Sequence, residues 1–223
     1  MDSFQLGKAI VERLVNAGHT AYFAGGFVRD YLLKLPSSDI DIATSAPPQE
    51  VMQLFEKTVP VGLAFGSVLV VVQGLSFEVT TFRCDGPYLD GRHPSYVRPS
   101  DARADAQRRS FTINGMFYDP IKEEVLDYVE GKKDLQAGII RTIGEAKHRF
   151  EEDKLRMIRA VRFAVRLGFT IEANTAAAIQ STAAELRVVS VERIWQELAK
   201  AHASPRFPDF LLQLHQFGLL EQI

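Results

Sequence analysis

The sequence predicts an α+β protein, with strands and helices mixed over residues 1–144 and only helices over residues 145–223. Up to about Gly144, short β-rich runs alternate with runs of helical hydrophobic period, as in a sheet packed against helices. From about Glu145 onward only the helical period recurs. With 223 residues and 46% hydrophobic content, the chain can bury a substantial core in one large domain or two small ones. We therefore expect a domain boundary near Gly144.

The elements of the first 144 residues follow from hydrophobic period and from the residues that interrupt it. Gly25 and Gly26 separate a buried strand from a helix, and Gly74 splits two β-rich runs into a hairpin. Pro47 and Pro48 suit the first turn of a helix, where a missing N–H costs nothing. The expected elements are helices over 3–17, 27–34 and 47–57, strands over 20–24, 39–43, 66–73, 75–83 and 123–129, and a short helix followed by a strand over 132–144.

Residues 84–105 interrupt this pattern, because they are too polar and too rich in proline for a core element. A loop of this length is uncommon without a purpose. In the C-terminal region, helices are expected over 145–167, 173–185, 190–201 and 205–219.

Charge and cysteine content exclude several classes of protein. The net charge of −2 gives no overall basic excess of the kind that announces a nucleic-acid binder. Cys84 is the only cysteine, which excludes a disulfide framework and suits the reducing cytoplasm. No apolar run approaches the length of a membrane span, and Met1-Asp2-Ser3 opens no signal peptide, so no membrane partner is expected. Nothing in the composition indicates an oligomeric state.

Two aspartates stand one residue apart in SSDIDIA (37–43). In a strand, Asp39 and Asp41 point to the same face. Their charges suit an exposed edge strand that resists pairing, or a Mg²⁺ site, because this hard cation prefers carboxylate oxygens. Glu78 lies in the apolar run FEVTTFR and brings a third carboxylate to the pair if the two strands are neighbours. Such a cluster can hold two divalent ions for phosphoryl transfer, although Glu78 alone equally fits an exposed strand position.

Two further stretches suit phosphate binding. Gly25 and Gly26 precede a helix whose free N–H groups attract anions, and Arg29 could reach a phosphate with both arms of its guanidinium. The same residues also fit a tight turn with a surface arginine. Arg108 and Arg109 precede alternating apolar and hydrogen-bonding residues, so they could bind phosphate or ribose, or simply begin a solvated helix.

A row of arginines recurs at spacings of three and four in the helical run 150–169, namely Arg156, Arg159, Arg162 and Arg166. Surface ion pairs explain a mixture of charges better than so strict a row. Asp153 stands one turn before Arg156, and a carboxylate beside a guanidinium offers an acceptor and donors in one plane. Cytosine and adenine expose an amino group next to a ring-nitrogen acceptor, whereas guanine and uracil present a carbonyl and an N–H. An edge formed by Asp153 and Arg156 would therefore accept C and A and reject G and U without a template.

The chain resembles the bacterial class II tRNA nucleotidyltransferases from about residue 20 to residue 200. The motifs that carry the resemblance occur in the family's order: GGFVRD, SSDIDIA, RRSFTINGM, EDKLR and ERIWQEL. This family comprises the CCA-adding enzymes and their poly(A) polymerase relatives, within the polymerase β superfamily. The resemblance implies a polymerase β-like head with a small mixed sheet over 1–144. It also implies a helical, base-recognising neck over 145–223, truncated before the family's body and tail domains.

The resemblance also implies roles for individual residues. Catalysis would rest on Asp39, Asp41 and Glu78, with Mg²⁺ bound by Asp39 and Asp41. The residues that would bind the nucleotide are Gly25, Gly26, Arg29, Arg109, Asp153, Arg156, Arg159 and Arg162. Ser110 departs from the family's usual R-R-D-F-T-I-N, in which the aspartate belongs to a region that recognises the ribose.

The function implied is addition of C and/or A, from CTP and ATP, to the 3′ end of tRNA, in CCA addition or repair. The stretch 85–97 resembles the flexible loop of CCA-adding and A-adding enzymes, and GLAFGSVLVVV (62–72) lacks the basic pair and histidine typical of poly(A) polymerases. The alternatives are a poly(A) polymerase and a catalytically impaired module that binds nucleotide or RNA.

Overall fold

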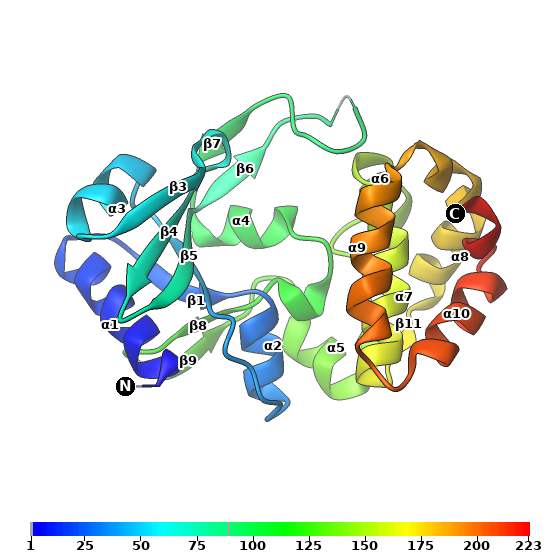
Figure 1. The fold of residues 1–223 in the computed structure, drawn as a ribbon, viewed down its shortest axis with the longest axis horizontal. Helices are drawn as coiled ribbons and strands as arrows, with labels where there is room; N and C mark the ends of the chain where they lie inside the picture. Colours follow the sequence, from blue (N-terminus) through cyan, green and yellow to red (C-terminus); the bar gives the residue numbers. More distant parts are fainter. Residues whose placement is uncertain (1, 89) are drawn as a thin grey trace. The chain divides into compact units, whose positions relative to one another are not determined.

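The computed structural model describes residues 2–88 and 90–223 and divides the chain into two compact units (Figure 1). The first unit comprises the described residues of Met1–Gly86, together with Tyr96–Arg109 and Ile113–Gly131. The second comprises the described residues of Pro87–Ser95, together with Ser110–Thr112 and Lys132–Ile223. In the part of the chain that the structure describes, every helix is too short or too polar to cross a membrane.

A seven-stranded sheet in the order β3-β4-β5-β2-β1-β8-β9 forms the centre of the first unit. Its strands are β1 (Ala21–Ala24), β2 (Asp41–Thr44), β3 (Thr58–Gly62), β4 (Ser67–Val72), β5 (Leu75–Thr81), β8 (Phe117–Asp119) and β9 (Glu124–Leu126). The helices of this unit are α1 (Ser3–Asn16), α2 (Gly26–Leu32), α3 (Pro48–Leu54) and α4 (Ala102–Arg108). A separate ribbon pairs β6 (Arg83–Asp85) with β7 (Val97–Pro99), and a 3₁₀ turn covers Leu63–Phe65.

The sheet is mixed because β2 and β5 run parallel while the other neighbouring strands are antiparallel. The parallel register pairs Ile42 with Val79 and Ala43 with Thr80. The preceding residues, Asp41 and Glu78, therefore lie side by side at the start of this register. The α+β class and the mixed sheet expected from the sequence are confirmed.

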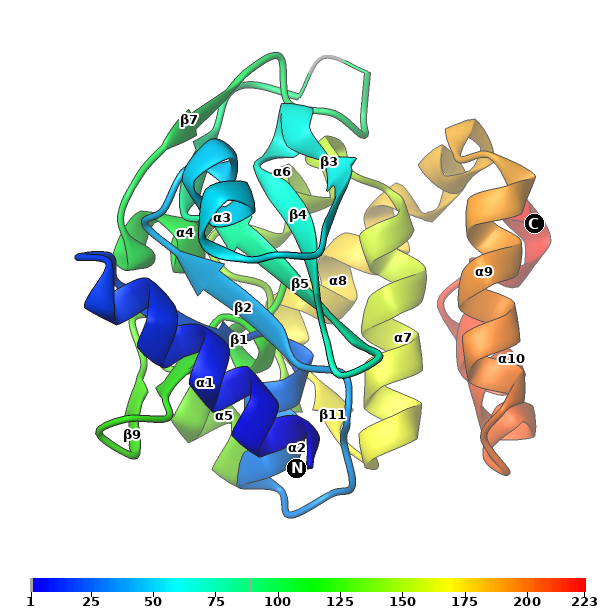
Figure 2. The same ribbon diagram turned by 60° about the vertical axis from the view of Figure 1, so that its left-hand side comes forward.

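The two faces of the sheet are covered by different helices (Figures 1 and 2). On one face, Phe4 of α1 packs edge-on against Phe23 of β1, with ring centroids 5.4 Å apart. On the other face, Ala24 and Ala43 belong to the buried cluster that also includes Ala106 of α4. Small side chains at these positions let α4 lie close to the sheet. This packing places the C-terminal end of α4, with Arg108 and the adjacent Arg109, at the sheet face that carries Asp41.

The second unit is built around α7 (Leu155–Leu167), whose apolar side is buried. Its other helices are α5 (Gly131–Ala137, whose first residue belongs to the first unit), α6 (Ala146–Glu152), α8 (Ala173–Thr182), α9 (Val191–His202) and α10 (Phe207–Gln216), with 3₁₀ turns at Ala183–Val188 and Leu220–Gln222. A short parallel pair joins β10 (Ile139–Ile140) to β11 (Thr170–Ile171). The helices α6, α9 and α10 all contact α7.

Several local expectations were wrong. The predicted loop over 84–105 contains most of β6, all of β7 and the first half of α4, because short elements with polar residues carry no clear hydrophobic period. The single helix expected over 145–167 is two helices, because Asp153 adopts an extended backbone (φ −156°, ψ 104°) between α6 and α7. The second of the two aspartates begins β2, whereas Asp39 precedes the strand. The head–neck boundary at residue 144 stays a prediction about domains, and the compact units divide the chain near residue 131.

Candidate functional site

A cavity of about 540 Å³ opens in the first unit beside the parallel strands β2 and β5. Its lining consists of Ala24, Asp41, Ile42, Ala43, Val61, Gly62, Phe65, Ser67, Glu78, Thr80, Arg83, Arg108 and Arg109. The carboxylates come from β2 and β5, and the guanidinium groups come from β6 and from the end of α4. One cavity therefore presents both anions and cations, which is the arrangement that a metal–phosphate ligand requires.

The acidic side of the cavity is electrostatically strained. Burial, Asp39 and Glu78 raise the pKa of Asp41 to about 6, while Arg109 acts in the opposite direction. Asp39 and Glu78 are exposed, whereas Asp41 is half-buried. Two neighbouring carboxylates would each favour a cation near Asp41, because like charges at short range oppose its ionisation.

The donor chemistry fits Mg²⁺, although no group of three or more His, Cys, Asp or Glu side chains is arranged to hold a metal among residues 2–88 and 90–223. Mg²⁺ commonly binds through one or two carboxylates, with water and substrate phosphates completing its coordination. Asp39 and Asp41 match that smaller requirement. The third carboxylate, Glu78, neighbours Asp41 in the strand register and lines the same cavity.

The basic side of the cavity is held by a carboxylate that lies behind it. Asp105 of α4 is only 1% exposed, and its Oδ2 accepts hydrogen bonds from Nη2 and Nε of Arg109 at 2.9 and 3.1 Å. Its Oδ1 accepts from Nε of Arg108 at 2.8 Å and, at 3.3 Å, from the backbone N–H of Arg83. Burial by itself would raise the pKa of Asp105, but the guanidinium groups of Arg109 and Arg108 outweigh it and lower that pKa.

Gly25 leaves room for the two sides of the cavity to meet. Its φ of +68° lies in the left-handed region, which glycine adopts without strain. A Cβ placed on Gly25 would stand 3.3 Å from Nη1 of Arg109 and 3.7 Å from Oδ2 of Asp41. The absent side chain therefore marks the point where the Arg109 guanidinium approaches the Asp41 carboxylate.

Arg29 supports the glycine turn from inside the protein. It is 2% exposed, its Nε and Nη2 donate to the Asp30 carboxylate at 2.8 Å, and its Nη1 donates to Oδ1 of Asn114 at 2.7 Å. Gly26, the first residue of α2, would place a Cβ 3.6 Å from the Arg29 guanidinium. The structure thus places Arg29 behind the turn, and the cavity lining of the first unit does not include it.

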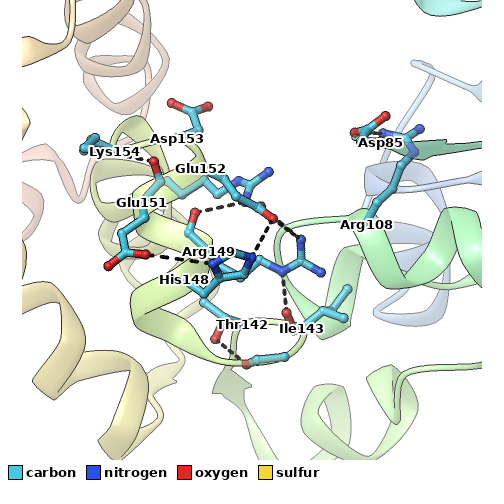
Figure 3. A network of polar contacts seen from close by, with 12 residues as sticks. Asp85, Arg108, Thr142, Ile143, His148, Arg149, Glu151, Glu152, Asp153 and Lys154 are labelled. Atoms are coloured by element: carbon cyan, nitrogen blue, oxygen red, sulfur yellow. Dashed lines mark hydrogen bonds and ion pairs between the residues drawn. The ribbon is translucent and has the colours of Figure 1, made fainter. Parts of the chain in front are cut away.

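In the second unit, the start of α7 lies in a network of ion pairs (Figure 3). The Arg156 guanidinium pairs with the Glu152 carboxylate and donates to the backbone oxygen of Arg149 at 2.9 Å. Arg149 also donates to Glu152, at 3.0 Å, and to the backbone oxygen of Ile143 at 2.6 Å. Burial would raise the pKa of Glu152, but Arg156 and Arg149 outweigh it and lower that pKa.

The side chains of Asp153 and Arg156, expected to form one edge, do not bond to each other in this structure. Oδ1 of Asp153 accepts from the backbone N–H of Leu155 at 3.1 Å, and its Oδ2 accepts from Nη2 of Arg193 on α9 at 2.9 Å. Arg156 instead lies 5.8 Å below the ring centroid of Tyr88. Their direct bond runs through the backbone, where the N–H of Arg156 donates to the carbonyl oxygen of Asp153 at 3.1 Å, at the break between α6 and α7.

The next two arginines of the row differ in their partners. Nε of Arg162 donates to Oε2 of Glu197 at 2.6 Å, and Glu197 is buried on α9. Arg159 lies between these pairs, with its guanidinium carbon 5.9 Å from the Phe163 ring centroid. Among the described residues, Arg159 makes no hydrogen bond or ion pair. It is therefore the guanidinium of the row that is open to an added anion or base.

The sequence did not reveal most of the residues that bind and position the arginines of the site. Arg83 lines the cavity but belongs to a stretch interpreted only as the end of a strand, whereas Arg108 was considered for phosphate or ribose binding as well as for a solvated helix start. Asp105 was not singled out, although its spacing of four residues before Arg109 is a recognisable signal on a helix. Glu152 was also missed, although it stands four residues before Arg156 at the same helical spacing. Arg193 was missed because its pairing with Asp153, 40 residues away in the chain, leaves no local pattern.

Two family comparisons cover most of the chain. Residues 21–141 match the family described as "Poly A polymerase head domain", and residues 168–223 match one described as "Probable RNA and SrmB- binding site of polymerase A". The first match spans more than half of the chain and contains the whole cavity lining.

Comparisons with individual proteins agree with the family match. The chain is 46% identical over 200 residues to a CCA-adding enzyme of Staphylococcus haemolyticus, covering 88% of this chain and 49% of that protein. The crystal structure of a Bacillus stearothermophilus CCA-adding enzyme in complex with CTP is similar with a TM-score of 0.90 and 41% identity, covering 98% of this chain and 53% of that one. A Thermotoga maritima CCA-adding enzyme complexed with tRNA has a TM-score of 0.82 and 25% identity, covering 98% of this chain and 51% of that one. The chain thus spans about half the length of the relatives it matches.

Proposed function

This chain belongs to the family of poly(A) polymerase head domains, and on that premise we propose that it is a template-independent nucleotidyltransferase. It adds C and A from CTP and ATP to the 3′ end of tRNA, in CCA addition or repair. The observation that carries the proposal is that Asp41, Glu78, Arg108 and Arg109 all line the same cavity. Similar proteins are CCA-adding enzymes, one crystallised with CTP and one with tRNA. The single cysteine favours a reducing compartment, so we also propose a cytoplasmic location.

The reaction is a substitution at phosphorus. The 3′-hydroxyl oxygen of the RNA attacks the α-phosphorus of CTP or ATP, the bond between the α-phosphorus and its bridging oxygen to the β-phosphate breaks, and pyrophosphate leaves. When bound at Asp39 and Asp41, Mg²⁺ would lower the pKa of the attacking hydroxyl and offset charge on the transferred phosphate. Glu78 adds negative charge beside this pair and favours binding of the cation.

The chain's own residues orient the nucleotide. Arg109, with the neighbouring Arg108, would contact the phosphates as charge-assisted donors, and the backbone at Gly25 and Gly26 leaves room for their approach. Arg29 would contribute indirectly, by holding the turn through Asp30 and Asn114. These contacts would hold the β- and γ-phosphates, which leave as pyrophosphate.

Base choice is proposed to lie in the second unit. Asp153 would accept from the amino group of cytosine or adenine, and Arg156 would donate to the neighbouring ring nitrogen. Arg159, which has no hydrogen bond or ion pair among the described residues, and Arg162 would line the same site. Because Asp153 and Arg156 have protein partners in this structure, binding of the base requires exchange of some of these bonds.

The decisive experiment offers labelled CTP and ATP to three tRNAs, ending before the CC, after the CC, or with the complete CCA. Incorporation limited to completing CCA supports the proposal. Unlimited A addition to a generic RNA primer would instead identify a poly(A) polymerase.

Ser110 favours one alternative of another class, a catalytically impaired module that binds nucleotide or RNA. The side chain at this position would be an aspartate in the family's usual motif, and a serine hydroxyl accepts hydrogen bonds less strongly than a carboxylate. Binding of CTP with Mg²⁺, together with no product on any of the three tRNAs, would establish this alternative. Restored incorporation in Ser110→Asp would show that the substitution itself limits activity.

A further inference from the structure

Asp105 lies behind the cavity and binds the arginine side chains that line it. The side chain is almost completely buried, and both of its oxygens accept hydrogen bonds from cavity-lining arginines. Its Oδ2 accepts hydrogen bonds from Nε and Nη2 of Arg109. Its Oδ1 accepts hydrogen bonds from Nε of Arg108 and from the backbone N–H of Arg83. All three arginines that line the cavity are thus tied to one carboxylate.

The bonds to Arg109 use only one edge of its guanidinium. Nε and Nη2 face Asp105, whereas Nη1 lies beside Gly25, where Oδ2 of Asp41 also lies. Among the described residues, Nη1 makes no hydrogen bond. The ring of Phe117, 5.0 Å from the guanidinium carbon, supports the plane of the group. Arg109 therefore presents one fixed donor group to the cavity.

The alternative partner for Arg109 is Asp41, whose carboxylate it already affects electrostatically. An arginine released from Asp105 would be drawn toward Asp41 and Glu78, because these are the carboxylates that share its cavity. Such a pair would occupy the donor that the phosphates need and would neutralise the carboxylate that the metal needs. By binding Arg109, Asp105 keeps the guanidinium from pairing with the Asp41 carboxylate.

We propose that Asp105 is a positioning residue that fixes Arg109 toward the phosphates of the incoming nucleoside triphosphate and keeps it from pairing with Asp41. The inference rests on the proposed function, because it takes the cavity to be the site of the nucleotide. It predicts that losing the Asp105 charge weakens binding of both nucleotide and Mg²⁺, and that these losses depend on the presence of Arg109.

The test is a double-mutant cycle on the full chain, read by calorimetric titration of CTP with Mg²⁺ and, separately, of Mg²⁺ alone. Asp105→Asn should weaken CTP binding about ten-fold, since one charge-assisted pair orients the donor. Arg109→Ala should weaken it by a similar factor. The variant that carries both Asp105→Asn and Arg109→Ala should bind CTP as tightly as Arg109→Ala alone. It should also bind Mg²⁺ more tightly than Asp105→Asn alone, because Arg109 is then absent and cannot pair with Asp41.

Asp134 supplies the matched control. It is a buried carboxylate of the second unit that accepts from Oγ1 of Thr112 at 2.7 Å and from Nε of Arg141 at 3.0 Å. Asp134→Asn should change CTP affinity by less than about two-fold, even if it lowers the melting temperature. Melting curves of every variant separate loss of stability from loss of orientation.

The outcomes distinguish the inference from the function on which it rests. A wild-type chain that binds no CTP with Mg²⁺ would overturn the proposed function and the inference together. If the wild type binds, a folded Asp105→Asn with unchanged CTP affinity, or losses that add fully in the double variant, would overturn the inference alone. If Asp105→Asn does not fold, Arg109→Lys replaces it, because lysine keeps the charge but lacks the planar edge whose two N–H groups Asp105 holds. Wild-type affinity in Arg109→Lys would likewise reject the positioning role.

Discussion

At the scale of single residues, Asp41 combines a functional position with an electrostatic cost. Burial, Asp39 and Glu78 raise its pKa to about 6, so the metal-free protein at neutral pH holds a carboxylate that would bind a proton readily. The penalty is absent below the ordinary value of 3.8, where the residue is protonated in both folded and unfolded states, and it is complete above about 6. In the absence of metal, Asp41 therefore makes the protein less stable as the pH rises through this window.

Asp41→Asn should separate activity from stability. We expect nucleotide incorporation to fall by about a thousand-fold or more, because the proposed metal pair is lost. The melting temperature in the absence of metal should rise by roughly 2–5 °C at neutral pH, because asparagine removes the cost of burying a charged carboxylate and its repulsion from Asp39 and Glu78. Incorporation assays and thermal melting of the same preparations test both statements. Ser37→Ala, a change at a half-buried loop residue before the pair, serves as the control, and full activity in Asp41→Asn would refute the metal assignment.

Stabilisation by Mg²⁺ should depend on pH in the direction that Asp41 sets. A carboxylate must be ionised to bind the cation, so the rise in melting temperature caused by Mg²⁺ should be present at about pH 7.5 and largely lost at about pH 5. Melting curves with Mg²⁺ and with a chelator, at several pH values, measure this. An equal Mg²⁺ effect at both pH values would place the cation elsewhere on the protein.

At the scale of the elements, one buried ion pair joins α7 to α9. Glu197 is 4% exposed and accepts from Arg162 at 2.6 Å, whereas Arg206 and Asp209 form an exposed pair at 3.2 Å on α10. Glu197→Ala leaves the Arg162 charge without its carboxylate and should destabilise the protein by about 3 kcal/mol. Asp209→Ala should cost about 0.5 kcal/mol or less. Urea unfolding of both variants gives the comparison, and equal costs would contradict it.

The break between α6 and α7 should control base selectivity. Asp153→Ala and Arg156→Lys are expected to reduce the preference for CTP and ATP over UTP and GTP by about ten-fold each, because each removes part of the proposed base edge. Arg156→Lys is preferred to alanine because Glu152 would otherwise lose a buried partner. Competition assays with the four nucleotides measure the ratio. Lys200→Gln, on the exposed side of α9, is the control, and unchanged ratios in both variants would remove the base-edge hypothesis.

The sequence predicts elements well where a long hydrophobic period exists and poorly where it does not. The helix over 3–17 and the hairpin split at Gly74 are confirmed within one to two residues. The short helix α4 was missed because its buried face consists of alanines, which carry little hydrophobic signal. The interruption at Asp153 was missed because the charged residues on either side fit a continuous helix equally well.

The candidate site shows the same limit for side chains. Asp41 and Glu78 could be placed together from the sequence once their strands were assumed to be neighbours, and the register confirms that pairing. The carboxylate partners of Arg109 and Arg156 stand four residues earlier in the chain and follow a helical spacing that the sequence contains. The contact of Arg29 with Asn114, 85 residues away, could not be predicted because the fold alone brings these residues together. The roles of these residues stay predictions.

At the scale of the whole molecule, the charges nearly cancel, with 26 Lys and Arg against 28 Asp and Glu. Under the proposed function, attraction to tRNA would come from local groups such as the arginine row of α7 and the cavity arginines. We expect tRNA binding to involve few phosphates, so the slope of log affinity against log salt should be about −2 to −3. Filter binding over a range of KCl concentrations measures the slope, with a short single-stranded RNA as control. A slope near about −8 would indicate a broad electrostatic surface instead.

The parallel pairing of β2 with β5 has a consequence for how the protein is made. Asp41 leaves the ribosome well before Glu78, and the hairpin of β4 and β5 must form and dock on β2 before the two carboxylates meet. Arg109 follows later still in the chain. Pairings between distant segments form slowly because a long loop must close first. The cavity therefore cannot be complete until more than a hundred residues have emerged, because Arg109 is the last residue of its lining.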